Sequence, residues 1–450
     1  MKKISAILII FAFILSFTSL VFASEIKSAD FKGLDKKSRG FIELLKKKNY
    51  KAATGYFDEV MKKEFAPEKL KKVWESLIHK VGQAQKITGM RIEKKDKYNI
   101  VFVTTKFEKY SFDLKLVFDS RKLISGMWFV PTKSAVKYKS PGYVKPGAFT
   151  EKEVTVGKGK WALPGTLSIP KGKGPFPVIL LVHGSGPNDR DETVGSNKPF
   201  KDLAHGLAST GVAVLRYEKR TKHHGAKLLA NLKKLTSKEE TIDDAVLAVK
   251  LLKKMKKIDP KKIYVLGHSL GGMFIPRIAE AAPSARGFII MAGTSKPLED
   301  VIWYQYNYIF SLDGKISDDE KKELAKLKKQ IARVKDPGLT KDTALTELPL
   351  GMPASFWLDV RDYKPAVEAK KIKRPVLVIQ GERDYQVTMD DYRGWKNALS
   401  GKKNVSFITY PLLNHLFIPG KGKSIPAEYM KPGNVSKKVV EDMARWIKKN

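Results

Sequence analysis

Ten residues at positions 263–272, reading IYVLGHSLGG, constrain the fold of this chain more than any other stretch. An apolar, β-branched run leads into Gly267, Ser269 and Gly271, and residues compatible with a helix follow. Glycines two positions on either side of the serine allow a sharp turn, because a Cβ at either place would crowd the strained serine backbone against the strand or the helix. The pattern therefore predicts a strand, a tight turn that presents Ser269 as a nucleophile, and a helix.

Apolar runs and helical periodicities alternate along residues 151–450. Continuous apolar runs such as 178–182 are typical of strands that are covered on both faces. Strands are predicted at 151–156, 163–169, 178–182, 212–216, 263–266, 287–292, 376–380 and 405–410, and helices at 201–209, 236–257, 273–282, 389–399 and 435–449. Strands that alternate with helices indicate the α/β class, here a mostly parallel sheet with helices on both faces.

One connection, residues 293–374 between two predicted strands, is far longer than a simple crossover requires. Within it, residues 297–357 hold two helix-like segments and the aromatic run WYQYNYIF at 303–310. We interpret 297–357 as a helical lid insertion whose apolar underside meets the substrate. The alternative is a helical insertion that packs only on itself.

An acid and a base follow two later strands. Ligands in such sheets meet the carboxyl ends of the strands, so the partners of Ser269 should lie there. Asp384 comes just after the strand at 376–380, and His415 follows the strand at 405–410 among apolar neighbours. We expect His268, inside the turn itself, to point away from the nucleophile. The order Ser269, Asp384, His415 matches a known chain order of serine-hydrolase triads.

Each of these three residues has an expected role in acyl transfer. His415 would take the proton of Ser269 and later protonate the leaving group, while Asp384 orients the imidazole. The oxyanion needs donors that are already aimed at it. The backbone N–H of Leu270 is one candidate, and the loop after residue 182 supplies the other, with Ser185 as first choice and Gly186 as second.

From about residue 151 to residue 450 the sequence resembles an α/β-hydrolase of the bacterial secreted esterase and serine-aminopeptidase-like type. The marks that carry the resemblance are HGSGPNDRD at 183–191, RYEKR at 216–220, the serine turn, GERD at 381–384 and Asn414-His415. The resemblance implies the α/β-hydrolase fold and hydrolysis of carboxylic esters through an acyl-enzyme on Ser269, without a metal or an organic cofactor. Short- or medium-chain acyl esters are the expected substrates.

Other functions share the same catalytic residues. Thioesterase, acyltransferase and peptidase chemistry need no change in the triad. A peptidase would need an anchor for a charged terminus, and an acidic rim could serve an amino group; its members would be Asp189, Asp191, Glu192 and Glu218. A remoter alternative is a non-catalytic protein that binds the cell wall.

Residues 24–130 form a different kind of unit. Apolar residues at helical spacing predict helices at 31–48 and 67–80, and strands are predicted at 99–105, 110–118 and 123–130. Helices followed by an antiparallel meander indicate a small α+β accessory domain, which resembles nuclear-transport-factor-like domains. Proline and glycine interrupt residues 131–150, which we interpret as a linker to the catalytic domain at 151–450.

Residues 1–23 have a basic start, a long apolar run and a small-residue site before Ser24, which is typical of a secretory signal peptide. We therefore expect a secreted or extracytoplasmic protein; the alternative is an uncleaved membrane anchor. No cysteine is present, which excludes disulfides and thiol catalysis. A net charge of +38 favours non-specific association with anionic cell-envelope surfaces, or simply reflects solvated lysines, and we expect no nucleic-acid partner.

Overall fold

The computed structural model describes residues 33–95, 98–108, 111–132 and 137–450. They divide into two compact units, one up to residue 132 and one from residue 137. The predicted signal peptide lies outside the described residues. Among the described residues, no helix is both long and apolar enough to cross a membrane.

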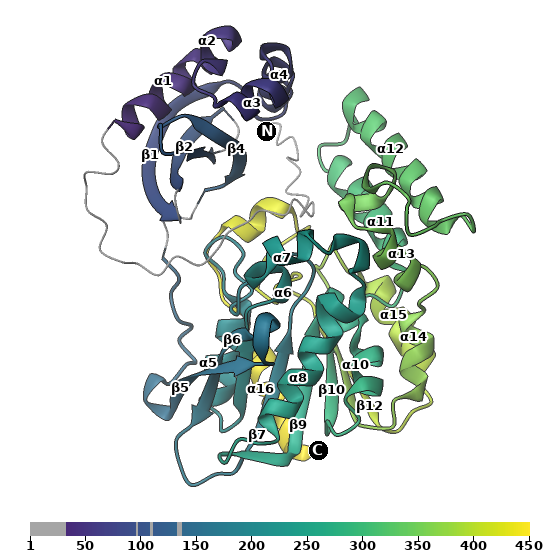
Figure 1. Cartoon of the computed structure of the whole chain (residues 1–450). Coiled ribbons are helices and arrows are strands. Elements are labelled where there is room, and N and C mark those ends of the chain that lie inside the picture. Colours follow the sequence, from purple (N-terminus) through teal and green to yellow (C-terminus); the bar gives the residue numbers. More distant parts are fainter. Residues whose placement is uncertain (1–32, 96–97, 109–110, 133–136) are drawn as a thin grey trace. The chain divides into compact units, whose positions relative to one another are not determined.

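The first unit contains helices followed by strands, as predicted (Figure 1). The helices are α1 (Leu34–Lys46), α2 (Tyr50–Thr54), α3 (Glu59–Glu64) and α4 (Pro67–Val81), and the strands are β1 (Ala84–Lys95), β2 (Tyr98–Phe107), β3 (Ser111–Phe118) and β4 (Ile124–Pro131). Each strand pairs antiparallel with the next one along the chain. The predicted α+β meander is therefore confirmed.

The core of this unit lies between its helices and one face of the sheet. Phe41 and Leu45 of α1 and Trp74 of α4 are buried in one cluster with Val101 and Leu116 of the sheet. The alternation of side chains along β2 and β3 supplies that apolar face. Aromatic residues such as Phe41 and Trp74 thus form part of this core.

The second unit is built on an eight-stranded sheet within the described residues, in the order β12-β11-β10-β9-β7-β8-β6-β5. The strands are β5 (Phe149–Val156), β6 (Leu163–Pro170), β7 (Phe176–Val182), β8 (Ala213–Tyr217), β9 (Ile258–His268), β10 (Gly287–Met291), β11 (Val376–Gly381) and β12 (Val405–Tyr410). Strands β7 to β12 run parallel to one another. Strand β6 pairs antiparallel with β8 on one side and with β5 on the other. The eight predicted strands are thus present in a mostly parallel sheet.

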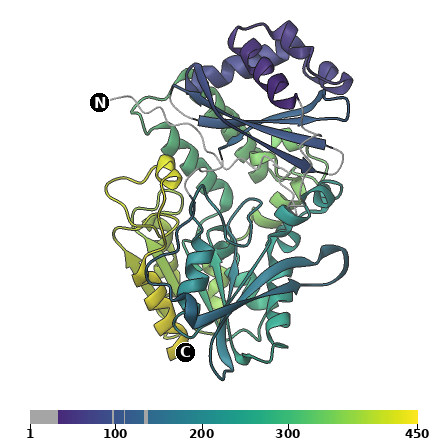
Figure 2. The same ribbon diagram turned by 90° about the vertical axis from the view of Figure 1, so that its left-hand side faces the viewer.

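Helices cover both faces of this sheet (Figures 1 and 2). Helices α5 (Pro199–Ala208) and α16 (Lys437–Lys449) share one buried cluster with the central strands. Helices α8 (Asp243–Leu252) and α10 (Ile275–Ala281) contact each other and β9, and α8 lies in front of the sheet in Figure 1, with α16 behind it. The fold is the predicted α/β-hydrolase architecture.

The long connection between β10 and β11 is mainly helical, as expected. It contains α11 (Leu298–Phe310), α12 (Asp318–Lys335), α13 (Ala354–Val360) and α14 (Pro365–Glu368). Ser317 and Glu320 form a reciprocal capping box that starts α12. Because β10 and β11 are parallel neighbours in the sheet, this connection leaves at the carboxyl end of β10, where the insertion begins, and returns to the amino end of β11.

The remaining helices of this unit are short or connect the strands. They are α6 (Arg220–His223), α7 (Gly225–Leu229), α9 (Leu270–Met273) and α15 (Met389–Leu399). Helix α9 begins directly after the serine turn, and α15 follows the loop that carries Asp384. The loops next to these two helices form the site described below.

Candidate active site

Ser269 lies in a strained turn between β9 and α9. Its backbone has φ 53° and ψ −116°, a conformation that residues with a Cβ rarely adopt. The N–H of Ser269 donates to the carbonyl of Met291 over 2.9 Å, and its carbonyl accepts the N–H of Met273. Bonds on both sides of the residue hold this geometry, and the Ser269 side chain stays half-buried and reachable.

The glycines of the turn are required by close backbone approaches. A Cβ on Gly271 would lie 2.6 Å from the carbonyl oxygens of Val182 and His183, and a Cβ on Gly267 would clash with the backbone of Gly271. Real Cβ atoms do not tolerate such contacts with main-chain atoms. The spacing that pointed to a nucleophile turn therefore has a steric cause in this fold.

Asp384 and His415 meet at the carboxyl ends of neighbouring strands. The Nδ1 atom of His415 lies 2.6 Å from Oδ2 of Asp384, and both side chains are buried. The other carboxylate oxygen of Asp384 accepts the N–H groups of Gln386 and Val387, over 2.7 and 3.1 Å. Gln380 also donates to Oδ2 over 3.1 Å. The carboxylate is thereby fixed in one orientation, with His415 as its partner.

Ser269 and His415 line one cavity of about 50 Å³. The residues that surround it come from the loops after β7, β9, β11 and β12 and from the C-terminal region; they are Gly184, Ser185, Asn188, Glu192, Val194, His268, Ser269, Gln386, His415, Leu416 and Tyr429. The structure therefore brings the predicted nucleophile and base to the same cavity, with Asp384 bound to the far side of the imidazole.

The loop after β7 is anchored through its carbonyl groups. The Gly184 carbonyl accepts Lys219 Nζ over 2.6 Å and Asn188 Nδ2 over 3.2 Å, and the Ser185 carbonyl accepts Asn188 Nδ2 over 3.0 Å. In a planar trans peptide the N–H points away from the carbonyl of the same unit. The N–H of Ser185 is therefore directed away from the ammonium group of Lys219.

Donors for an oxyanion remain available next to Ser269. Among the residues that the structure describes, the N–H groups of Ser185 and Leu270 donate to no protein acceptor. Ser185 and Leu270 both line a cavity together with Ser269, whereas Gly186 lines neither cavity beside the nucleophile. This placement favours Ser185 over Gly186 as the second donor.

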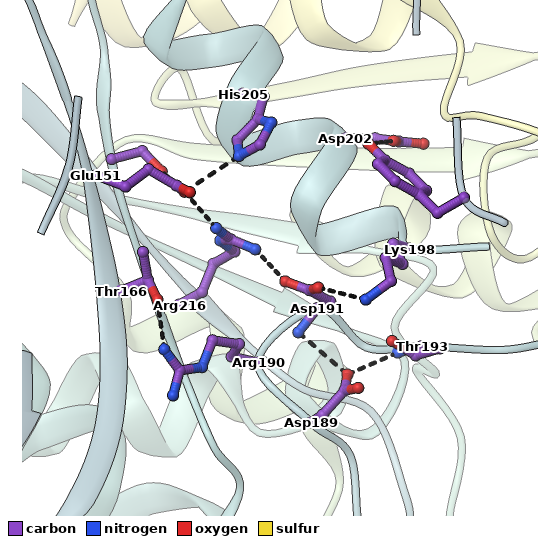
Figure 3. A network of polar contacts seen from close by, with 12 residues as sticks. Glu151, Thr166, Asp189, Arg190, Asp191, Thr193, Lys198, Asp202, His205 and Arg216 are labelled. Carbon is purple, nitrogen blue, oxygen red and sulfur yellow. Dashed lines mark hydrogen bonds and ion pairs between the residues drawn. The ribbon is translucent and has the colours of Figure 1, made fainter. Parts of the chain in front are cut away.

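A network of ion pairs ties this loop to the end of β8. Arg216 pairs with Asp191 and, over 2.6 Å, with Glu151, and Lys198 pairs with Asp191 over 2.8 Å (Figure 3). Figure 3 shows Arg216 between the two carboxylates, with Asp189 capping the turn below. The signal was present in the sequence as opposite charges at 189–192 and 216–220.

His183, at the start of the same loop, has a structural role. Its ring Nε2 lies 3.0 Å from the carbonyl oxygen of Asp189, and the side chain is buried. Burial lowers the pKa of His183 to about 4, despite the opposing charge of Glu192. The ring is therefore neutral at pH 7.

A second cavity of about 90 Å³ extends from Ser269 beneath the insertion. Its walls are mostly apolar; the insertion contributes Leu298, Val301, Ile302, Gln305, Tyr306, Ile309, Leu350, Met352, Phe356 and Trp357, and the catalytic loops contribute Ser185, Ser269, Leu270, Thr294, Tyr385, Gln386 and Val387. The underside of the insertion thus faces the nucleophile, as a lid does. Within the described part of the chain, no three His, Asp or Glu side chains gather as a metal-binding group.

Comparison with known proteins gives two family matches. Residues 179–419 match the model described as "Alpha/beta hydrolase family", and residues 38–127 match a model described as a protein of unknown function (DUF3887). The chain is also 40% identical over 421 residues, 93% of this chain and 96% of the relative, to Esterase EstD of Thermotoga maritima.

Solved structures are more distant. Est1E from Butyrivibrio proteoclasticus is 15% identical, with a TM-score of 0.43 over 66% of this chain and 99% of that chain. An esterase of Pyrococcus furiosus is 16% identical, with a TM-score of 0.43 over 71% of this chain and 99% of that chain.

Proposed function

This chain belongs to the α/β-hydrolase family, and we propose that it hydrolyses carboxylic esters through an acyl-enzyme on Ser269. It is an esterase, a serine hydrolase related over nearly its whole length to Esterase EstD. The observation that carries the proposed roles is the contact of His415 Nδ1 with Asp384 Oδ2 at the cavity that also holds Ser269. The acid, the base and the nucleophile come from three separate loops at one edge of the sheet.

The proposed reaction has two halves. The Ser269 hydroxyl attacks the acyl carbon while its proton moves to His415, and Asp384 stabilises the resulting imidazolium. The tetrahedral oxyanion accepts the N–H groups of Leu270 and Ser185. His415 then gives its proton to the departing alkoxide as the bond between the acyl carbon and the alcohol oxygen breaks. A water molecule repeats the sequence on the acyl-enzyme and releases the carboxylic acid.

The two cavities suggest how an ester is oriented. The leaving alcohol must reach His415, so it belongs in the cavity that His415 lines. The acyl chain then occupies the apolar cavity under the insertion, which His415 does not line. An apolar, enclosed compartment of this size supports short or medium acyl chains.

The carboxylates of the acidic rim considered for an aminopeptidase are all engaged in contacts within the protein. Asp191 pairs with Arg216 and Lys198, and Glu218 pairs with Arg190 over 2.9 Å. Asp189 accepts the N–H groups of Asp191 and Thr193, and Glu192 pairs with His268 over 2.8 Å. Carboxylates that are already paired make poor anchors for a substrate ammonium group, so the structure favours ester over aminopeptide substrates.

The test is a substrate panel on the purified protein. We expect turnover of p-nitrophenyl esters with acyl chains of graded length, weaker turnover of the matched thioesters, and far slower turnover of aminoacyl anilides. Ser269→Ala should remove turnover and covalent labelling by a phosphonate while leaving the thermal unfolding midpoint in place. Anilide turnover above ester turnover would overturn the choice of substrate, and an active Ser269→Ala variant would overturn the nucleophile.

The cellular location is also a proposal. The basic and apolar residues 1–23 support export with cleavage before Ser24, and the net charge of +38 supports weak association with anionic envelope polymers. N-terminal sequencing of the protein from the extracytoplasmic fraction should begin at Ser24, and salt should release it from envelope preparations. An intact Met1 in the mature protein would indicate an uncleaved anchor instead.

A further inference from the structure

His268 lies within the serine turn, yet its side chain has no place in the reaction described above. It is 3% exposed, and both of its ring nitrogens face oxygen atoms. Nδ1 lies 2.8 Å from Oε2 of Glu192, and Nε2 lies 3.0 Å from the main-chain carbonyl oxygen of His415. The rings of His268 and His415 are adjacent, with centroids 4.7 Å apart.

The two contacts determine where the protons are. A carbonyl oxygen can only accept, so Nε2 of His268 carries a hydrogen. The carboxylate of Glu192 lies at ion-pair distance from the other nitrogen, without the alignment of a hydrogen bond, and a proton on Nδ1 would give the ring the charge that pairs with it. An imidazolium beside a carboxylate satisfies both contacts, whereas a neutral ring would turn a lone pair toward Oε2.

The local charges agree with an ionised pair. Burial lowers the pKa of His268, but the charge of Glu192 and the contact with it outweigh burial and raise that pKa overall. Burial likewise raises the pKa of Glu192, but the charge of His268 and the contact with it, together with His183 and the N–H of Gly184, outweigh burial, and the pKa of that carboxyl is lowered. The ionised state of each residue is stabilised by the other.

Glu192 also reaches the oxyanion loop. Its Oε1 accepts the N–H of Gly184 over 2.7 Å, and a Cβ on Gly184 would lie 3.1 Å from Cβ of Ser269. Glu192 itself is buried and has φ 51°, a backbone conformation that costs a non-glycine residue about 1 kcal/mol. The surrounding contacts hold the residue in this conformation with its carboxylate between Gly184 and His268.

We infer that Glu192 and His268 form a buried ion pair that positions the general base and the oxyanion donor around Ser269. Glu192 fixes the His183–Gly184 peptide, which adjoins the peptide that carries the Ser185 N–H, and His268 fixes the carbonyl of His415. The pair therefore acts on the loops on both sides of Ser269. Neither residue is catalytic in this scheme; both act through residues that touch the ester. The inference rests on the proposed esterase function, which the Ser269→Ala variant tests separately.

Several charged or titratable groups surround this pair. Asp384 and His415 lie on the side of the catalytic imidazole, and His183 lies near Glu192. Lys219 lies near His183 and holds the other side of Gly184. Loss of the His268 proton at alkaline pH would place its Nδ1 lone pair against the carboxylate of Glu192 and loosen the arrangement.

Two variants test the inference in the full-length protein. Glu192→Gln keeps the shape, can accept the Gly184 N–H and can donate to Nδ1 of a neutral His268. We expect the wild-type kcat to decline at alkaline pH, and we expect this variant to keep most of the kcat at neutral pH and to lose that decline. His268→Phe removes the donor to the His415 carbonyl, and we expect kcat to fall by about 100-fold with a much smaller change in KM.

His224→Phe is the matched control, because His224 is also buried and its Nε2 lies 2.9 Å from a main-chain carbonyl, that of Ala162. It should leave kcat and the pH profile unchanged. An alkaline decline in Glu192→Gln equal to that of the wild-type would overturn the inference, as would a His268→Phe variant with wild-type kcat. If His268→Phe does not fold, the pH profile of Glu192→Gln alone decides the outcome.

Discussion

Lys219 donates to the carbonyl of Gly184 over 2.6 Å, while its ammonium group also lies 2.5 Å from the carboxylate of Glu240. Both charged side chains are buried, so the lysine is held by a fixed counter-charge. Its contact with Gly184 orients the peptide whose N–H belongs to Ser185. A residue of the conspicuous RYEKR segment at 216–220 thus sets the direction of a proposed oxyanion donor.

Replacing Lys219 should therefore weaken catalysis through the loop. In Lys219→Met/Glu240→Gln, which leaves no buried unpaired charge, we expect kcat to fall by about 10- to 100-fold because the Gly184–Ser185 peptide loses its anchor. Lys219→Met alone should also lose about 3–5 kcal/mol of unfolding free energy. Ester kinetics and denaturant titration measure both effects, and Lys250→Met, at an exposed position on α8, is the control. A double variant with wild-type kcat would contradict the assignment.

Asp384→Asn should reduce kcat by about 10⁴-fold with the fold retained. The asparagine can present an N–H group toward Nδ1 of His415, which holds the imidazole in the wrong tautomer. Ester turnover and circular dichroism would be measured together. Asp390→Asn is the matched control, since Asp390 is exposed and pairs with Arg393. If Asp384→Asn retained a tenth of the activity or more, another acid would have to serve His415.

Val301→Phe should narrow the range of acyl groups. Val301 lies on α11, is buried, and lines the apolar cavity next to Ser269. A larger side chain there should lower kcat/KM for octanoyl esters by about 10- to 100-fold while acetyl esters keep theirs, because each buried methylene contributes about 0.8 kcal/mol. Tyr304→Phe, on the same helix but partly exposed and outside that cavity, should change neither value. Equal losses for both esters would place the acyl chain elsewhere.

The buried carboxyl group of Asp202 predicts how the free energy of unfolding depends on pH. It is buried, accepts the Tyr138 hydroxyl over 2.7 Å, and burial raises its pKa to about 6 even though its hydrogen bonds oppose the shift. Because the folded pKa exceeds the unfolded value, the stabilisation by this proton is complete below about pH 4 and is lost as the pH rises through about 6. Asp202→Asn should therefore gain roughly 1–3 kcal/mol relative to the wild-type at about pH 8, and little at about pH 4.

Denaturant unfolding of both proteins at the two pH values would check this prediction. An equal change in unfolding free energy at both pH values would mean that Asp202 keeps its charge in the folded protein. The Tyr138 and Val435 contacts of this carboxylate lie far along the chain from Asp202, so the result would also report on how firmly residues 137–143 are held.

The sheet and the placement of the candidate triad were predictable because both depend on local patterns. Apolar runs such as 178–182 and 376–380 form strands wherever they are buried, and the residue that follows a strand necessarily lies at its end. Asp384 and His415 could be placed by this rule together with the chain order Ser269, Asp384, His415. In the first unit, the short helices α2 and α3 were missed because they carry too few residues to show a period.

The contacts that support the site could not be predicted. Lys219 meets Gly184, and His268 meets both Glu192 and His415, through pairings between loops distant in the sequence. Each of these residues, taken alone, resembles an ordinary solvated charge or a structural histidine. Only the arrangement of β7, β8, β9 and β12 brings them together.

The insertion between β10 and β11 has one further consequence. The side chains that it contributes to the acyl cavity come from one contiguous stretch of the gene, residues 298–357, while Ser269, Asp384 and His415 are encoded outside it. Mutations confined to that stretch can change which acyl groups are accepted without altering the bond-breaking residues. Chimaeras in which residues 298–357 are exchanged between homologues should therefore show the acyl preference of the donor and the chemistry of the recipient.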